Sequence, residues 1–208
     1  MNLLKKRIIA ITGPSGVGKT TLGDKLSIHN DISIPYHCTT RKKRNDDKEG
    51  FYRYLSHEQY KYLFETSKFL ISSGDGMIIS PEYGNFYGVL LSDCLTSWMN
   101  SDIIILFVSY KDIDTLIWLK KIGINIDIVN LRFKDIANGV FCRLSNNVNR
   151  NHTVCEIDKR IISALDDNKK YGEMVAINSE CIIYTDEKTI EETYNDVCNK
   201  LKIRKLKK

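Results

Sequence analysis

Short β-branched runs alternate along this chain with stretches in which apolar residues recur at helical spacing. The run Arg7 to Thr12 predicts a first strand, which stops at Gly13. After a short gap, Thr20 to Ser27 predicts a helix with Leu22 and Leu26 on one face. The chain is therefore expected to open as a strand, a glycine-containing loop and a helix.

The same alternation returns in the second half of the chain. Alternating strands and helices predict a parallel sheet with helices on both faces, so the expected fold class is α/β. The expected elements are the strands Ile103 to Ser109, Ile124 to Phe133 and Cys181 to Tyr184, and the helices Ile113 to Lys121, Ala137 to Leu144, Val154 to Lys170 and Ile190 to Leu201.

A polar, aromatic-rich segment from Tyr36 to about Leu91 separates these units, and it contains a predicted helix around His57 to Ser67. Its composition is typical of a substrate-binding insert, and the Asn-rich stretch Ser145 to His152 suits a mobile lid. We expect a single domain over residues 1–208. Its parts are a core at 1–35, 92–144 and 171–203, an acceptor-binding insert at about 36–91, a lid at about 145–160 and a basic tail at 204–208.

Charge and cysteine usage narrow the class of protein. The formal net charge of +5 comes largely from Lys200 to Lys208, so the body is nearly neutral and nucleic acid is an unexpected but not excluded partner. Six scattered cysteines without a CxxC pair, and no hydrophobic leader, favour the cytoplasm. The longest apolar run, Ile103 to Val108, is too short to span a bilayer, so no membrane partner is expected. The oligomeric state is not indicated.

The loop after the first strand carries the most specific motif. It fits G-x-x-x-x-G-K-[ST] between a predicted strand and a predicted helix, which is the phosphate-binding P-loop in its required context. Backbone N–H groups and the helix N-terminus would hold the phosphates of ATP, Lys19 would reach the β- and γ-phosphates, and Thr20 would ligate Mg²⁺. The expected ATP-binding residues are Gly13, Pro14, Ser15, Gly16, Val17, Gly18, Lys19, Thr20 and Thr21.

Three further motifs follow the P-loop in order: Thr39 to Arg44 (TTRKKR), Gly50 to Tyr54 (GFYRY) and Tyr83 to Gly88 (YGNFYG). Together with the P-loop they resemble the guanylate kinase family. The resemblance implies a P-loop kinase fold with a substrate-binding insert and a lid, using ATP and Mg²⁺.

Carried over residue by residue, the family's clamp on the acceptor phosphate falls on Arg41, Arg44, Tyr52 and Tyr87. Guanidinium groups bind phosphate oxygens bidentately and tyrosine hydroxyls add neutral donors, so this set suits a phosphate dianion. Arg143, Arg150 and Arg160 fall in an order like that of the family's lid arginines. With Lys19 they are the expected catalytic cations, because the transferred phosphoryl group spreads negative charge over its oxygens.

The residues that read guanine in the family are not retained in the same places. Those positions hold His37, Ile78, Val89, and Phe107 with Ser109, although Glu82 or the Asp112-Ile113-Asp114 segment could substitute after a local gap. The change at Phe107 and Ser109 also removes the carboxylate that usually supports magnesium. Thr20, phosphate oxygens and water are left as ligands. GMP is therefore expected to be a poor acceptor.

The leading hypothesis is an ATP-dependent kinase that acts on a small phosphorylated acceptor, a nucleoside monophosphate or a related phosphomonoester. The first alternative is a true guanylate kinase with atypical base contacts. A non-catalytic binding module with the same fold, and a kinase that acts on nucleic acid, are further alternatives.

Overall fold

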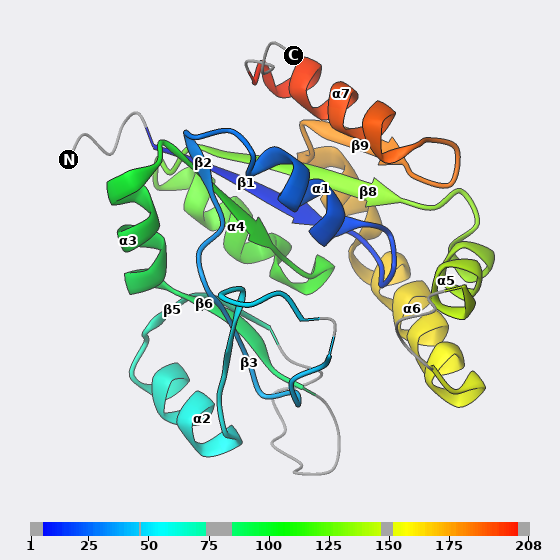
Figure 1. The fold of residues 1–208 in the computed structure, drawn as a ribbon, viewed down its shortest axis with the longest axis horizontal. Coiled ribbons are helices and arrows are strands. Elements are labelled where there is room, and N and C mark those ends of the chain that lie inside the picture. Colours follow the sequence, from blue (N-terminus) through cyan, green and yellow to red (C-terminus); the bar gives the residue numbers. More distant parts are fainter. Residues whose placement is uncertain (1–5, 46, 74–84, 147–151, 204–208) are drawn as a thin grey trace.

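A parallel five-stranded sheet forms the centre of the molecule (Figure 1). The computed structural model describes residues 6–45, 47–73, 85–146 and 152–203. The strand order is β2-β7-β1-β8-β9. The strands are β1 (Arg7–Thr12), β2 (Ile32–Ser33), β7 (Ile103–Phe107), β8 (Ile126–Arg132) and β9 (Cys181–Tyr184).

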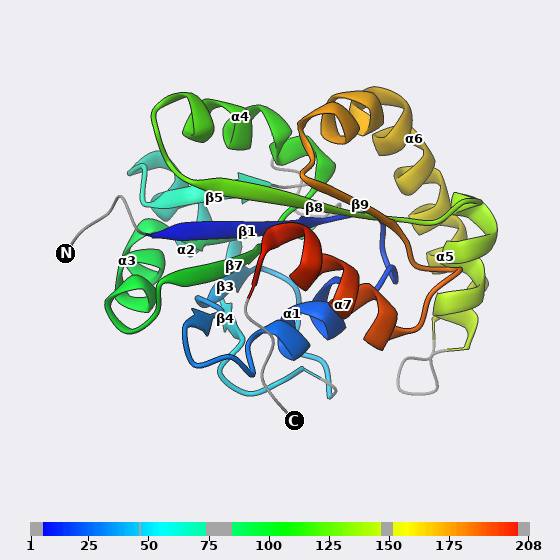
Figure 2. The same ribbon diagram turned by 90° about the horizontal axis from the view of Figure 1, so that it is seen from above.

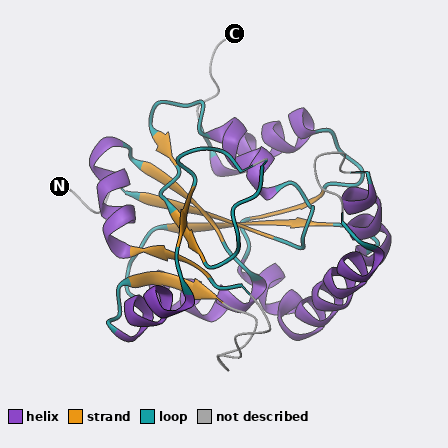
Figure 3. Cartoon of the chain, turned by 60° about the horizontal axis from the view of Figure 1, so that its bottom comes forward, coloured by secondary structure: helices purple, strands orange, loops and turns teal. Residues whose placement is uncertain are grey.

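Helices cover both faces of this sheet, with α4 and α6 on one side and α1 and α7 on the other (Figure 2). Because β1 is buried on both faces, its sequence Ile8 to Ile11 is continuously apolar. Figure 3 shows the helices around the outside of the strands. They are α1 (Lys19–Leu26), α3 (Leu91–Asn100), α4 (Ile113–Lys121), α5 (Ile136–Ser145), α6 (Val154–Asn178) and α7 (Ile190–Leu201), with a 3₁₀ turn, η2, at Tyr110–Asp112.

A smaller four-stranded sheet, of order β4-β3-β6-β5, lies within residues 37–90. It consists of β3 (His37–Thr39), β4 (Tyr52–Tyr54), β5 (Phe69–Ser73) and β6 (Tyr87–Leu90), and α2 (His57–Glu65) precedes β5. β3 pairs with β4 in parallel and with β6 antiparallel. This sheet places the predicted clamp residues of β4 and β6 on either side of β3.

The α/β fold class predicted from the sequence is confirmed, and each helix and core strand expected above is present within a few residues of its expected bounds, except at one helix end. The helix beginning at Val154 continues past Lys170 to Asn178, because Tyr171 and Val175 extend its apolar face. Helix α3 was not expected. Its N-cap, Leu90, makes no side-chain capping hydrogen bond, so the sequence carries no start signal there. None of the described helices is long and apolar enough to cross a membrane.

The contact between α1 and β7 allows a test of the core. A Cβ on Gly23 would lie 2.3 Å from the Phe107 ring, so Gly23→Ala should destabilise the fold by about 1–3 kcal/mol despite the better helix propensity of alanine. Urea unfolding should show this loss, and the additional change Phe107→Leu should recover part of it. Thr21→Ala, an exposed position in the same helix, is the control and should change stability by less than about 0.5 kcal/mol. A Gly23→Ala protein as stable as this control would contradict the packing.

Candidate active site

The loop between β1 and α1 has the backbone geometry that its glycines make possible. Gly13, Gly16 and Gly18 have φ angles of 141°, 79° and 99°, in the region that residues with a Cβ rarely adopt. A Cβ on Gly13 would also lie 2.2 Å from the carbonyl oxygen of Leu131 on β8. The loop therefore packs directly against the end of β8, and α1 begins at its far side with its N-terminal N–H groups facing the loop.

Lys19 is the first residue of α1, and its side chain reaches back into this loop. Its Nζ donates hydrogen bonds to the carbonyl oxygens of Gly13 at 2.7 Å and Pro14 at 2.9 Å. Burial, together with the nearby charge of Arg160, lowers the pKa of Lys19 to about 8. The ammonium group of Lys19 thus lies at the loop, where it would attract an anion.

The predicted catalytic arginines occupy different places. Arg160 on α6 reaches the loop, where its Nη1 donates to Ser15 Oγ at 2.7 Å. Arg143 on α5 packs its Cβ against Gly16 and donates from Nη2 to the carbonyl of Thr185, so it lies behind the loop and away from the cavity lining. Arg150 lies outside the described residues, together with the rest of residues 147–151 of the predicted lid. The catalytic roles of all three stay predictions.

The predicted acceptor clamp is organised by a carboxylate that the sequence analysis did not identify. Arg41 donates from Nη1 and Nη2 to the two oxygens of Asp47, at 2.6 and 2.5 Å, and its guanidinium carbon lies 4.5 Å from the centre of the Tyr52 ring. Asp47 also accepts from the Tyr54 hydroxyl at 2.6 Å and from the backbone N–H of Arg44 at 2.7 Å. One carboxylate therefore fixes the side chain of Arg41 and the backbone of Arg44.

This ion pair is buried, with side-chain exposures of 5% for Arg41 and 3% for Asp47. Burial by itself would raise the pKa of Asp47, but the hydrogen bonds from Arg41, Tyr54 and the Arg44 backbone outweigh it and hold the pKa well below its usual range. The same pairing raises the pKa of Arg41 against the effect of burial. Both groups therefore stay charged at neutral pH.

A single cavity of about 900 Å³ joins the P-loop to the clamp. Lys19, Thr20 and Arg160 line it at one end, and Arg41, Arg44, Tyr52 and Tyr87 line it at the other. Its size is within the range of natural ligand pockets and is sufficient for two small ligands side by side. The structure thus brings together the two groups of residues that the sequence placed in separate motifs.

The part of the cavity beyond the clamp is mostly apolar, with Ile71, Val89 and Phe107 in its wall. His37 also lines it, but both of its ring nitrogens are already hydrogen-bonded. Nδ1 donates to the Pro35 carbonyl and Nε2 accepts from the Phe107 N–H. Burial lowers the pKa of His37 to about 4, so the ring is neutral near pH 7.

Asp112 supplies a carboxylate in this part of the wall, although it lies beyond the end of β7. It is only 4% exposed, and its Oδ2 accepts from the backbone N–H of Ser109 at 2.7 Å. The short 3₁₀ turn after β7 brings it back to the cavity. Ile78 and Glu82 lie outside the described residues.

Sequence reasoning did not identify Asp47 and Arg132, two of the charged residues of the site. Asp47 sits in a turn of charged residues where nothing distinguishes it, and only the fold shows that it faces Arg41. Arg132 ends β8 and lines the cavity. Its position was open to prediction, because ligands in open α/β sheets bind at the carboxyl ends of the strands.

Magnesium fits this site only with few protein ligands. Among the residues that the structure describes, no three His, Cys, Asp or Glu side chains are grouped to hold a metal ion. Thr20 lines the cavity at the start of α1, next to Lys19. An ion that keeps several of its waters and is shared with phosphate oxygens suits one hydroxyl ligand.

Comparison with known proteins finds guanylate kinases among both the sequence relatives and the solved structures. The chain is 34% identical over 96 residues to a guanylate kinase of Mycoplasmopsis synoviae, covering 45% of each chain. It is 30% identical over 133 residues to that of Mycoplasmopsis pulmonis, covering 57% of this chain and 64% of the relative. These two alignments span less than two thirds of the relatives' lengths. A longer alignment, 27% identical over 186 residues, covers 83% of this chain and 81% of the guanylate kinase of Campylobacter jejuni strain RM1221.

No protein-family model matches the sequence. Among solved structures, the guanylate kinase of Anaplasma phagocytophilum superposes with a TM-score of 0.64 over 97% of this chain and 87% of that chain, at 17% sequence identity, which shows a common fold. The sequence relatives, the P-loop in its strand–loop–helix setting and the shared fold agree. The chain is similar to guanylate kinases in sequence and in fold.

Proposed function

We propose that this protein is an ATP- and Mg²⁺-dependent kinase that transfers the γ-phosphoryl group of ATP to GMP, forming ADP and GDP. The observation that carries the proposal is the single cavity with a phosphate-binding loop at one end and a clamp of arginines and tyrosines at the other. Phosphoryl transfer requires two phosphate groups to be held in line, so catalysis is mainly positioning and charge stabilisation.

Each end of the cavity has a distinct task in this proposal. The P-loop backbone and the N-terminus of α1 hold the ATP phosphates, and Lys19 and Arg160 offset the charge that develops during transfer. Arg41, Arg44, Tyr52 and Tyr87 hold the acceptor phosphate so that its oxygen faces the γ-phosphorus. Magnesium, when bound through Thr20, neutralises phosphate charge and orients the phosphates.

GMP is proposed as the acceptor because the sequence relatives are guanylate kinases, in preference to the different acceptor expected from the sequence. The carboxylate of Asp112 in the apolar part of the cavity supports it, since a carboxylate can accept from the N1–H and 2-amino groups of guanine. The altered positions His37, Val89 and Phe107 favour a second candidate, another nucleoside monophosphate, because none of them offers guanine a free polar group.

A coupled assay of ADP release with GMP, IMP, AMP, CMP and UMP separates these candidates. GMP should have the highest kcat/KM, and IMP, which lacks the 2-amino group, should be about 10- to 100-fold worse because one hydrogen bond to the base is lost. A higher kcat/KM for any other nucleotide would replace GMP as the acceptor. No ADP release with any of them would refute the kinase assignment.

Lys19→Ala tests the P-loop end. The protein should stay folded, while kcat should fall by about 10²-fold or more, because a charge that stabilises the transferred group is lost. Unchanged turnover in a stable variant would contradict the role of Lys19.

The lowered pKa of Lys19 predicts a pH dependence of nucleotide binding. Because Lys19 loses its proton near pH 8, binding of MgATP above that pH must first restore the proton, and the affinity should fall by about fivefold between pH 8 and pH 9. Calorimetric titration of wild-type protein should show this decline, whereas the weak binding of Lys19→Ala should lack it. Equal pH slopes in the two proteins would contradict the assignment.

Asp47→Asn tests the organisation of the clamp. Loss of the charge leaves buried Arg41 without its partner, so the free energy of unfolding should fall by about 3 kcal/mol at pH 7 and the KM for the acceptor should rise about tenfold or more, with a smaller change in the KM for ATP. The pKa of Asp47 is lowered by folding. Its stabilising effect is therefore present above about pH 4 and is lost at lower pH, where wild type and variant should converge.

Asp24→Asn is the matched control, because Asp24 forms an exposed ion pair with Lys48. It should change stability by less than about 1 kcal/mol and leave the KM for the acceptor unaltered. If Asp47→Asn behaved like this control, Asp47 would not organise the clamp.

A further inference from the structure

Arg132 is a cation of the cavity to which neither the P-loop nor the clamp assigns a role. It is the last residue of β8, and Asn130, two residues earlier, is in register with Thr12, which immediately precedes the P-loop. Gly13 packs against the carbonyl of Leu131. Because neighbouring strands are about 4.8 Å apart, the backbone of Arg132 lies beside the entrance of the P-loop.

The side chain of Arg132 points to the face of the sheet that α6 covers. Side chains alternate along a strand, and Ile126 and Ile128 pack in one apolar cluster with Val175 of α6, so Arg132 follows them on that face. The direct contact agrees: Arg132 Nη2 donates to Asn168 Oδ1 on α6 at 2.7 Å. Asn168 lies about two turns, or about 12 Å, along α6 from Arg160, which reaches Ser15 of the P-loop.

Arg132 has a neutral hydrogen-bond partner, whereas two other cations of the cavity have carboxylate partners. Arg41 is paired with Asp47, and Lys111 with Asp167 at 3.7 Å. Within the part of the chain that the structure describes, no carboxylate forms an ion pair with Arg132, and its hydrogen bond to Asn168 uses one of five guanidinium N–H donors. An amide orients a guanidinium without cancelling its charge. The cavity therefore contains an oriented guanidinium group next to the phosphate-binding loop, and no described carboxylate forms an ion pair with it.

We propose that Arg132 is a further catalytic arginine, which contacts the phosphoryl group in transfer, and that Asn168 is its positioning residue. The inference rests on the proposed kinase function. As an oxygen of the acceptor phosphate bonds to the γ-phosphorus, the bond from that phosphorus to the β–γ bridging oxygen breaks, and ADP leaves with the electron pair. Arg132 neither gives nor takes a proton; it offsets negative charge on the oxygens of the transferred group.

The test compares Arg132→Gln, Arg132→Lys and Asn168→Ala with wild type and Lys19→Ala, using ATP, Mg²⁺ and GMP. Arg132→Gln should lower kcat by about 10²- to 10³-fold while the Kd for MgADP, measured by calorimetry, changes less than about threefold, because ADP lacks the transferred group. Arg132→Lys should recover part of kcat. Asn168→Ala should lower kcat about tenfold, since the charge remains but is less well placed.

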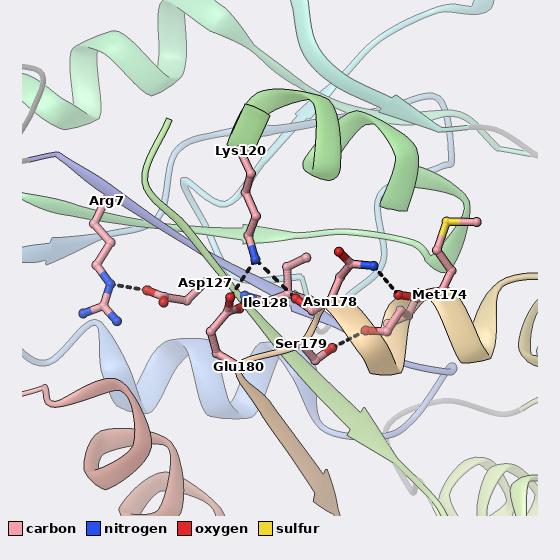
Figure 4. Close-up of polar contacts among 9 residues, drawn as sticks. Arg7, Lys120, Asp127, Ile128, Met174, Asn178, Ser179 and Glu180 are labelled. Carbon is pink, nitrogen blue, oxygen red and sulfur yellow. Dashed lines mark hydrogen bonds and ion pairs between the residues drawn. The ribbon is translucent and has the colours of Figure 1, made fainter. Parts of the chain in front are cut away.

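Lys120→Gln is the control for loss of one positive charge. Lys120 binds Asn178 and Glu180 near the start of β8, where Glu180 also accepts from the Ile128 N–H, at the opposite end of the strand from Arg132 (Figure 4). Its kcat should stay within about twofold of wild type. Arg132→Gly is an additional variant for chemical rescue. Added guanidinium at millimolar concentration should raise the rate of Arg132→Gly but not that of Lys120→Gln. A purely structural role of Arg132 would not produce this rescue.

The outcomes that would overturn the proposal are distinct. Wild-type kcat in Arg132→Gln, with wild-type protein active, would refute the role of Arg132 alone. Parallel losses of kcat, MgADP binding and thermal stability without rescue by guanidinium would show that Arg132 is structural. A wild-type protein that is inactive with GMP, IMP, AMP, CMP and UMP alike would refute the kinase function and this inference with it.

Discussion

The parallel pairing of β1 with β7 and β8 is the constraint on which the site depends. Parallel strands bring their carboxyl ends to one edge of the sheet, and here three different connections leave that edge side by side: the P-loop after Thr12, the turn at Tyr110–Asp112 and the segment after Arg132. The backbone contact between Gly13 and Leu131 sets how closely the loop follows β8. Lys19, Asp112 and Arg132 consequently face one cavity although more than a hundred residues separate the first from the last.

Electrostatics then distinguish the two ends of the cavity. At the P-loop end, burial of Lys19 and, to a smaller extent, the nearby charge of Arg160 lower the pKa of Lys19. At the clamp end, Asp47 compensates Arg41 and lets it remain charged while almost completely buried. A carboxylate thus keeps the buried guanidinium of Arg41 ordered at this end of the cavity.

The wall beyond the clamp combines packing residues with one carboxylate. His37 uses both ring nitrogens to tie the start of β3 to the end of β7 and to the preceding loop, and it stacks on Phe51, so it acts as a packing residue. Val89 and Phe107 extend this apolar wall, whereas Asp112 returns a carboxylate to it from a different position along the chain. The shape of the cavity and its polar groups are therefore set by different residues.

Sequence by itself determined the local features of this protein. The P-loop was predictable because its glycines, lysine and threonine act within one short segment, and the helices from His57, Val154 and Ile190 were predictable because their apolar spacing is strong; each of these three also begins with a capping box. Helix α3 and the strands β3, β5 and β6 of the second sheet lacked such local signals. Only the tertiary structure decided the pairing of Asp47 with Arg41, the return of Asp112 to the cavity and the place of Arg132 beside the P-loop, because these depend on strand order, register and the turns between elements, which no local pattern of residues encodes.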